Sequence, residues 1–123
     1  MLTKIIYDSR KKKKFKLSVL FSYYNNQETI KKSLESIINQ TYKNFEIIIC
    51  SDGSTDRSDI IVKHLIENFD NILLLKSYKN SGLTKTLNHM MKFSRGEYFA
   101  RHDADDYSHK QRLEYRINFL NVN

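Results

Sequence analysis

Residues 45–56 read FEIIICSDGSTD, a short and nearly continuous apolar run that passes directly into carboxylate, hydroxyl and glycine residues. The run has the length and the branched side chains of a buried strand, and the polar cluster after it is typical of a turn. A strand that is apolar at nearly every position is covered on both faces, which is typical of parallel sheets. This stretch therefore predicts a buried strand of a parallel sheet that ends in a polar loop.

Similar apolar runs lie on both sides of this stretch, at residues 17–24, 72–75 and 98–101, and each is followed by apolar residues at helical spacing. The pattern predicts an α/β fold, with a Rossmann-like parallel sheet of four strands that alternate with four helices on both faces. Gly96 is interpreted as a left-handed cap that ends the third helix. The helical stripes are Ile30, Leu34, Ile37 and Ile38; Ile61, Val62, Leu65, Ile66 and Phe69; Leu83, Leu87, Met90 and Met91; and Leu113, Ile117 and Leu120.

A chain of 123 residues with a net charge of +7 is predicted to form one domain. Part of the charge lies in the run at residues 10–14, just before the first apolar segment. We interpret residues 1–15 as a basic, flexible leader and residues 16–123 as the folded part. The alternative is that the run attracts anionic lipid headgroups or nucleic acid.

The cysteine content and the hydropathy of the chain bear on its cellular compartment and exclude cysteine-based sites. Cys50 is the single cysteine, so a disulfide within the chain and a cysteine-based zinc site are both excluded. No apolar stretch approaches the roughly 20 residues of a membrane helix, and residues 1–15 do not resemble a secretory signal. We therefore expect a cytoplasmic protein, with peripheral association with the inner face of the membrane as an open alternative.

Polar clusters follow three of the predicted strands, at residues 22–26, 51–56 and 103–106. In open parallel sheets, ligands bind beyond the carboxyl ends of the strands. The turns that lead from the helices into the strands, by contrast, contain few residues suited to chemistry. The sequence therefore predicts one active edge of the sheet.

The sharpest of these clusters is Asp103-Ala104-Asp105-Asp106. Adjacent carboxylates repel one another unless a cation neutralises them, and oxygen ligands of this kind suit Mg²⁺ or Mn²⁺. The alternative is a solvated acidic turn before the last helix. An EF-hand is excluded by Tyr107 and Ser108 at ligand and glycine positions, and neither a P-loop nor a dinucleotide-binding glycine motif is present.

Six consecutive blocks carry a resemblance to a known family. They are residues 17–25 (LSVLFSYYN), 33–42 (SLESIINQTY), 45–49 (FEIII), 51–56 (SDGSTD), 80–88 (NSGLTKTLN) and 96–106 (GEYFARHDADD). In this order they resemble family 2 glycosyltransferases, and the resemblance covers Lys16 to about Leu120. It differs at Ser22, where the family often has proline, and at Ser51, where it often has a second aspartate.

The resemblance implies a GT-A fold that binds a nucleoside diphosphate sugar, most simply a UDP-sugar, together with Mg²⁺ or Mn²⁺. Residues 16–123 would then be the nucleotide-sugar-binding half of such a domain. By this mapping Ser22 and Tyr24 line the base pocket, and Asp52 accepts a hydrogen bond from the base. Asp103 lies near the ribose and the metal, Asp105 ligates the metal, and Lys85 approaches the phosphates; His102 is a minor candidate for a donor contact.

Family members invert the anomeric centre with the help of a general base in an acceptor-binding part. That base is expected beyond Asn123, so no catalytic residue is assigned, and whether this piece is an enzyme stays open. The alternatives are a non-catalytic basic adaptor that binds lipid headgroups or nucleic acid, and a degraded gene fragment. A glycosyltransferase domain is not expected to bind nucleic acid, but its last strand could self-associate through an exposed edge.

Overall fold

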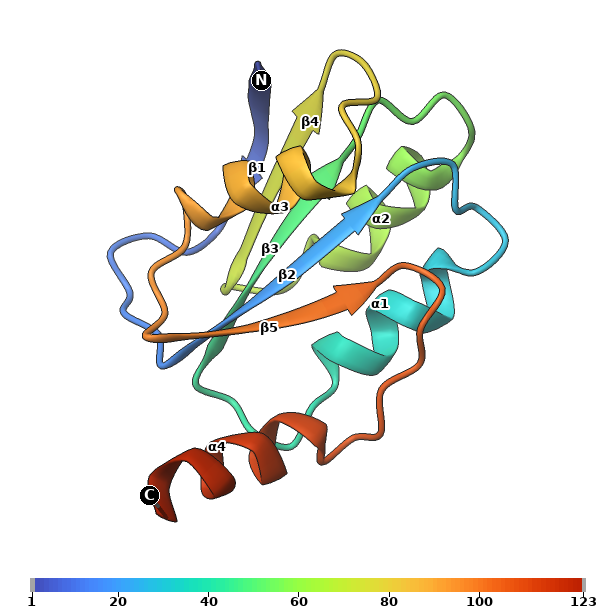
Figure 1. Cartoon of the computed structure of the whole chain (residues 1–123). Coiled ribbons are helices and arrows are strands. Elements are labelled where there is room, and N and C mark those ends of the chain that lie inside the picture. Colours follow the sequence, from blue (N-terminus) through green and yellow to red (C-terminus); the bar gives the residue numbers. More distant parts are fainter. Residues whose placement is uncertain (1, 123) are drawn as a thin grey trace.

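The computed structural model describes residues 2–122, with side chains through residue 120. In this part of the chain, five strands and four helices alternate after an initial pair of strands (Figure 1). Met1 and Asn123, the outer ends of the predicted leader and of the predicted binding half, lie outside the described residues. The elements are β1 (Thr3–Asp8), β2 (Leu17–Tyr23), α1 (Ile30–Ile38), β3 (Phe45–Ser51), α2 (Ser58–Ile66), β4 (Ile72–Ser77), α3 (Leu83–Met91), β5 (Tyr98–Asp103) and α4 (Arg112–Val122).

The strands form one sheet in the order β1-β4-β3-β2-β5. Strands β2 to β5 pair in parallel, and β1 pairs antiparallel with β4. In this register Ser22 lies opposite Cys50 on one side and opposite Asp103 on the other. The predicted α/β class is therefore confirmed, with a mixed sheet of five strands instead of a parallel sheet of four.

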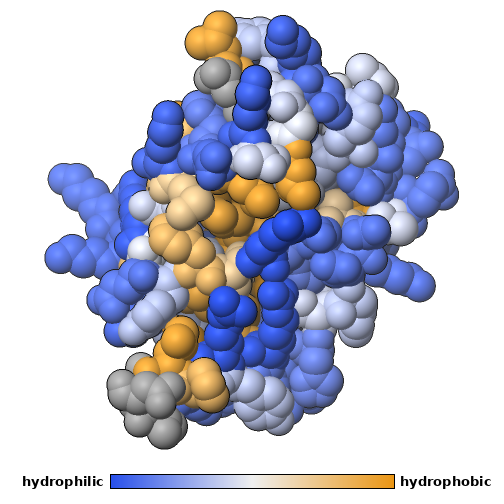
Figure 2. Space-filling view, viewed as in Figure 1, coloured by the Kyte–Doolittle hydropathy of each residue, from blue (hydrophilic) through white to orange (hydrophobic). Residues whose placement is uncertain are grey.

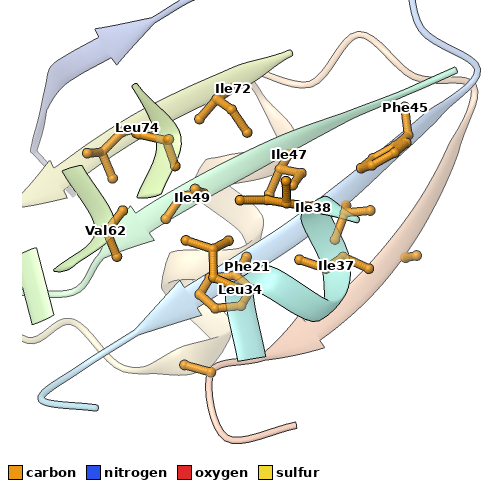
Figure 3. Close-up of a cluster of buried hydrophobic side chains, with 14 of the residues drawn as sticks. Phe21, Leu34, Ile37, Ile38, Phe45, Ile47, Ile49, Val62, Ile72 and Leu74 are labelled. Atoms are coloured by element: carbon orange, nitrogen blue, oxygen red, sulfur yellow. The ribbon is translucent and has the colours of Figure 1, made fainter. Parts of the chain in front are cut away.

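Side chains that alternate along the strands fill two cores, one on each face of the sheet. Leu17, Val19 and Phe21 of β2 belong to the larger core, together with side chains of α1, α2 and α4. Figure 3 shows Phe21 of β2 beside Leu34 of α1 in this core. Leu20 and its neighbours Ile48 and Leu73 form the smaller core beneath α3. Each fully buried side chain of this size contributes about 1.5–3 kcal/mol, so the two cores together fix the sheet between its helices.

Helix α3 covers β2 and β3 on its face, and β5 is left without a helix there (Figure 1). Hydrophobic side chains accordingly gather across the middle of this face (Figure 2). Leu83 and Met91 of α3 and Phe99 of β5 are exposed. None of the helices within residues 2–122 is both long enough and apolar enough to cross a bilayer.

The prediction that residues 1–15 form a flexible leader is wrong for β1. This strand extends the sheet beyond β4, with an irregularity in its register between Ile5 and Tyr7. Its side chains are only half-buried or exposed, as is usual for an edge strand. The missing apolar run is the reason that the sequence pattern did not indicate a strand here.

The basic run also begins inside the fold, because Arg10 is buried. Its guanidinium lies 3.0 Å from the Glu46 carboxylate and 3.0 Å from that of Asp8, and it also donates to the Phe93 carbonyl at 2.7 Å. Glu46 is fully buried and accepts a second hydrogen bond, of 2.6 Å, from the Ser18 hydroxyl. Arg10 therefore neutralises a carboxylate in the middle of the sheet.

Gly96 is not the left-handed helix cap that the sequence suggested. The glycines with positive φ in the described residues are Gly53 and Gly82. Gly96 instead lies against β2, where a Cβ atom would come within 2.5 Å of the Ser18 hydroxyl oxygen. Its amide donates to that oxygen at 2.8 Å, so the glycine permits a close approach between backbones.

Replacing Arg10 by methionine tests whether this residue belongs to the core or to a leader. The substitution leaves Glu46 buried without its cationic partner, which is expected to lower the free energy of unfolding by about 3–5 kcal/mol. The exposed Lys12 provides the matched control, and Lys12→Met should change stability by less than about 0.5 kcal/mol. Urea unfolding measures both, and equal stabilities of the two variants would contradict the burial of Arg10.

Candidate functional site

A cleft of about 280 Å³ opens at the carboxyl edge of the parallel strands. Of the residues predicted to form the site, the cleft is lined by Ser22, Tyr24, Asp52, Asp103 and Asp105. Lys85, on the first turn of α3, is exposed and does not line the cleft. Asn26, which belongs to the predicted polar cluster at residues 22–26, also lines the cleft, and so do residues to which the sequence assigned no role, including Asn80, Gly82, Leu83 and Arg101.

The loops after β2 and β3 are joined through Asn25, which has a φ of 51°. The backbone amide of Asn25 donates to the Ser54 hydroxyl at 3.0 Å. Its side-chain oxygen accepts from the amides of Thr55 and Asp56 at 2.8 and 3.2 Å. The first two predicted polar clusters thus form one rigid wall beside the cleft.

Asp52 joins the loop after β3 to the loop after β4. It is nearly fully buried, and its carboxylate accepts from the amides of Ser81 and Gly82 at 2.9 and 3.1 Å. A carboxylate has about four acceptor positions, so these two bonds leave capacity for a ligand donor. That Asp52 accepts a hydrogen bond from a base therefore stays a prediction, which the geometry permits.

The acidic loop after β5 brings three carboxylates together. Ligand atoms of Asp103, Asp105 and Asp106 lie within 4.8 Å of one another, and the last two residues are exposed. Two hydroxyls at the start of α1 hold the loop. Ser33 of α1 donates to the Asp103 carbonyl at 2.9 Å, and Thr29, just before the helix, donates to the Ala104 carbonyl at 3.0 Å. Clustered carboxylate oxygens at an open position fit a hard divalent cation such as Mg²⁺ or Mn²⁺.

Arg101 forms a two-point ion pair with Asp103. Its Nε and Nη2 atoms donate to the two carboxylate oxygens at 2.8 and 3.1 Å. The hydrogen bonds and the charge of Asp103 raise the pKa of the guanidinium. Strand periodicity could have identified this residue, because positions two apart lie on the same face.

His102 points to the opposite face of the sheet and does not line the cleft. Its ring is buried and stacks on Phe21, with 5.5 Å between the ring centroids. The ring nitrogens lie 3.0 Å from the Ser33 hydroxyl and 2.8 Å from the Ser108 hydroxyl. Burial and the neighbouring Arg112 lower the pKa of His102, so it holds the acidic loop from behind as a neutral ring.

Asp59 of α2 ties together the ends of three strands beside the cleft. Its carboxylate accepts from the hydroxyls of Tyr23 and Ser51 at 2.6 and 2.7 Å, and it forms an ion pair with Lys76. Burial opposes the ionisation of Asp59, but hydrogen bonds from Lys76, Tyr23 and Ser51 outweigh it and lower the pKa of the carboxyl. This network fixes the position of Tyr23, which also lines the cleft.

A largely parallel α/β sheet with a polar cleft and an acidic loop at its carboxyl edge is an arrangement that many nucleotide-binding folds share. Comparison with known proteins makes this specific, since the model of the family "Glycosyl transferase family 2" matches residues 18–123. The chain belongs to glycosyl transferase family 2. Ser22, Asp52 and the acidic loop all lie inside the matched region.

Two relatives show the extent of the similarity. EpsE of Bacillus subtilis (strain 168), to which a glycosyltransferase activity is provisionally assigned, is 42% identical over 106 residues, or 85% of this chain and 38% of EpsE. The Escherichia coli UDP-Glc:alpha-D-GlcNAc-diphosphoundecaprenol beta-1,3-glucosyltransferase WfaP is 35% identical over 104 residues, or 85% of this chain and 41% of WfaP. The chain thus spans about two fifths of the length of these relatives.

The fold also matches solved structures. TarS of S. aureus (residues 1–349), in complex with UDP-GlcNAc, aligns with a TM-score of 0.82 and 31% identity, over 88% of this chain and 32% of that chain. This similarity establishes a GT-A type sheet, in agreement with the expectation from sequence.

The Asp59 network generates a prediction about acid stability. Because folding lowers the pKa of Asp59 below its ordinary value of 3.8, its contribution is complete above that pH and is lost as the pH falls through the lower, folded pKa. Asp59→Asn is therefore expected to destabilise the protein near neutral pH, and the stability difference from the wild type should shrink below about pH 4. Urea unfolding at several pH values measures it, with the exposed Glu67→Gln as control, and a difference independent of pH would contradict the network.

Proposed function

We propose that this domain binds a nucleoside diphosphate sugar, with a UDP-sugar as the first candidate, for inverting transfer of the sugar to an acceptor. The observation that carries the proposal is the convergence of Asp52, Asp103 and Asp105 on one cleft at the carboxyl edge of the sheet. The complex of TarS with UDP-GlcNAc supports this donor class, and so does the name of WfaP, which includes UDP-Glc.

The charges in the cleft support a metal-dependent mode of binding. Three carboxylates and the single cation Arg101 stand among its described lining residues. An anionic diphosphate would be repelled by this surface unless further positive charge enters with it. Asp103 and Asp105 would hold Mg²⁺ or Mn²⁺, which supplies charge neutralisation for the departing diphosphate.

The remaining roles follow from position in the cleft. Ser22 and Tyr24 would line the base pocket, and Asp52 would orient the base through a hydrogen bond. Lys85, which lies outside the cleft lining, would reach the phosphates only if its flexible side chain bends toward them. The base that deprotonates the acceptor hydroxyl is proposed to lie beyond Asn123.

Titration of UDP with and without Mn²⁺ tests the donor site. The wild type is expected to bind UDP more tightly when Mn²⁺ is present. Asp105→Asn should weaken the UDP affinity measured with Mn²⁺ about tenfold or more, because an interaction with a charged group contributes about 1.5–3 kcal/mol. Glu67→Gln removes an exposed carboxylate just after α2 and serves as control. Isothermal titration calorimetry measures each affinity. A UDP affinity that is the same with and without Mn²⁺, and the same in Asp105→Asn as in the wild type, would refute the proposal.

The exposed lysines of the basic run favour a second, peripheral role at a membrane. Lys11 and Lys13 are held in an ordered turn, because the Arg95 guanidinium donates to their carbonyls at 2.8 and 3.2 Å. Lys12 and Lys14 are exposed beside them. We propose that this turn attracts the anionic headgroups of the inner membrane face and that the protein is otherwise cytoplasmic, since each lysine near such a surface contributes about 1 kcal/mol.

Co-sedimentation with vesicles tests this role. The protein should sediment with phosphatidylglycerol vesicles at low salt and dissociate as the salt concentration rises. The triple variant Lys11→Ser, Lys12→Ser, Lys14→Ser should lose most of the binding, whereas the matched triple variant Lys31→Ser, Lys32→Ser, Lys63→Ser should retain more of it. Equal losses in the two variants would contradict the proposal, and tighter binding to duplex DNA than to vesicles would favour the nucleic-acid alternative.

A further inference from the structure

Arg101 is the cation among the described residues that line the cleft. It lies on β5, opposite Leu20 of β2, and Asp103 follows two positions later on the same face of the strand. Both residues line the cleft, and both belong to the edge strand of the sheet. Arg101 therefore stands beside the acidic loop, on the wall that a bound diphosphate would face.

The pairing of these two residues occupies both carboxylate oxygens of Asp103. The guanidinium Nε and Nη2 atoms lie 2.8 and 3.1 Å from them. A metal ion that uses Asp103 as a ligand must first replace the guanidinium at one or both oxygens. The exchange is inexpensive, because the two side chains are 50% and 39% exposed and an ion pair this open to solvent stabilises little.

After the exchange, the guanidinium of Arg101 has lost its carboxylate partner. It is the one cation among the described residues that line the cleft. Its planar set of N–H donors matches the oxygens of a phosphate group as well as those of a carboxylate. Water can also solvate the freed group, but a phosphate that enters the same cleft replaces the lost charge interaction. The geometry therefore provides an anion site that is available only after Asp103 has changed partners.

We propose that Arg101 is an exchangeable counter-ion, which neutralises Asp103 before a divalent cation binds and holds a phosphate of the donor afterwards. This inference rests on the proposed function and deepens it, by naming a specific phosphate-binding residue and a source of cooperativity. Metal alone binds somewhat less tightly than it would to an unpaired Asp103, because it must separate the ion pair. Metal and nucleoside diphosphate together bind cooperatively, because the diphosphate takes up the released guanidinium.

The test uses Arg101→Gln and compares binding of Mn²⁺ alone with binding of UDP at saturating Mn²⁺. Mn²⁺ alone, followed by electron paramagnetic resonance, should bind the variant about twofold to fivefold more tightly than the wild type, as expected for an exposed pair. UDP, followed by calorimetry, should bind the variant about tenfold more weakly, the loss expected for a charge-assisted hydrogen bond. Uridine, which carries no phosphate, should bind both proteins equally.

Two further variants separate this effect from a general change of charge or fold. Arg101→Lys keeps the charge without the planar donor set, so its UDP affinity should fall between those of the wild type and Arg101→Gln. Lys43→Gln removes one positive charge from the turn before β3, at the amino ends of the parallel strands and therefore away from the cleft. This variant should change neither the Mn²⁺ affinity nor the UDP affinity. Thermal unfolding of each variant confirms that the fold is retained.

The outcomes distinguish this inference from the proposed function. Unchanged Mn²⁺ affinity or unchanged UDP affinity in Arg101→Gln overturns the counter-ion role, while the donor site itself stands if the wild type still binds UDP through Asp105. A wild-type protein that binds no UDP overturns both. Tighter Mn²⁺ binding together with weaker UDP binding and unchanged uridine binding supports the exchange.

Discussion

The buried carboxylate of Glu46 is the constraint on which the arrangement of the sheet depends. It lies near the start of β3 and receives hydrogen bonds from the Arg10 guanidinium, the Ser18 hydroxyl and the Arg95 amide. These donors come from the connection before β2, from β2 itself and from the connection before β5. A buried charge without such partners is strongly unfavourable, so the three strands are fixed in one register at this edge. A slip of one residue would also turn every side chain to the wrong face.

Because the register is fixed near the amino ends of the strands, it also determines where their carboxyl ends lie. Because Ser22 is paired with both Cys50 and Asp103, the polar residues after β2, β3 and β5 emerge side by side. Hydrogen bonds between the loops then complete the cleft, most clearly at Asp52, which binds the backbone beyond β4. The site is thus made mainly of backbone and carboxylate groups that the fold holds in place before any ligand binds.

Sequence patterns predicted the features that depend on local periodicity. The apolar runs located four strands, and the rule that ligands lie at carboxyl ends placed Ser22, Asp52 and Asp103 at one cleft. The features that were missed depend on pairing between distant residues. Arg10 looked like part of a solvated run because its partner Glu46 lies 36 positions away, and β1 lacked a pattern because an edge strand buries little. Gly96 was misread for the same reason, since its contact is with β2 and not with its own helix.

The two edges of the sheet are protected unequally. On one side β1 covers β4, and on the other β5 ends the described sheet while it also carries Arg101 and Asp103. On its outer side β5 is held by α4 and not by a strand, because Arg112 donates to the Arg101 carbonyl at 2.8 Å and Arg116 donates to the Phe99 carbonyl at 3.4 Å. The strand that carries Arg101 and Asp103 therefore depends on the last helix for its outer contacts, whereas Asp52 follows the central strand β3. One half of the cleft is thus set by the core of the sheet, and the other half by two arginine side chains of α4.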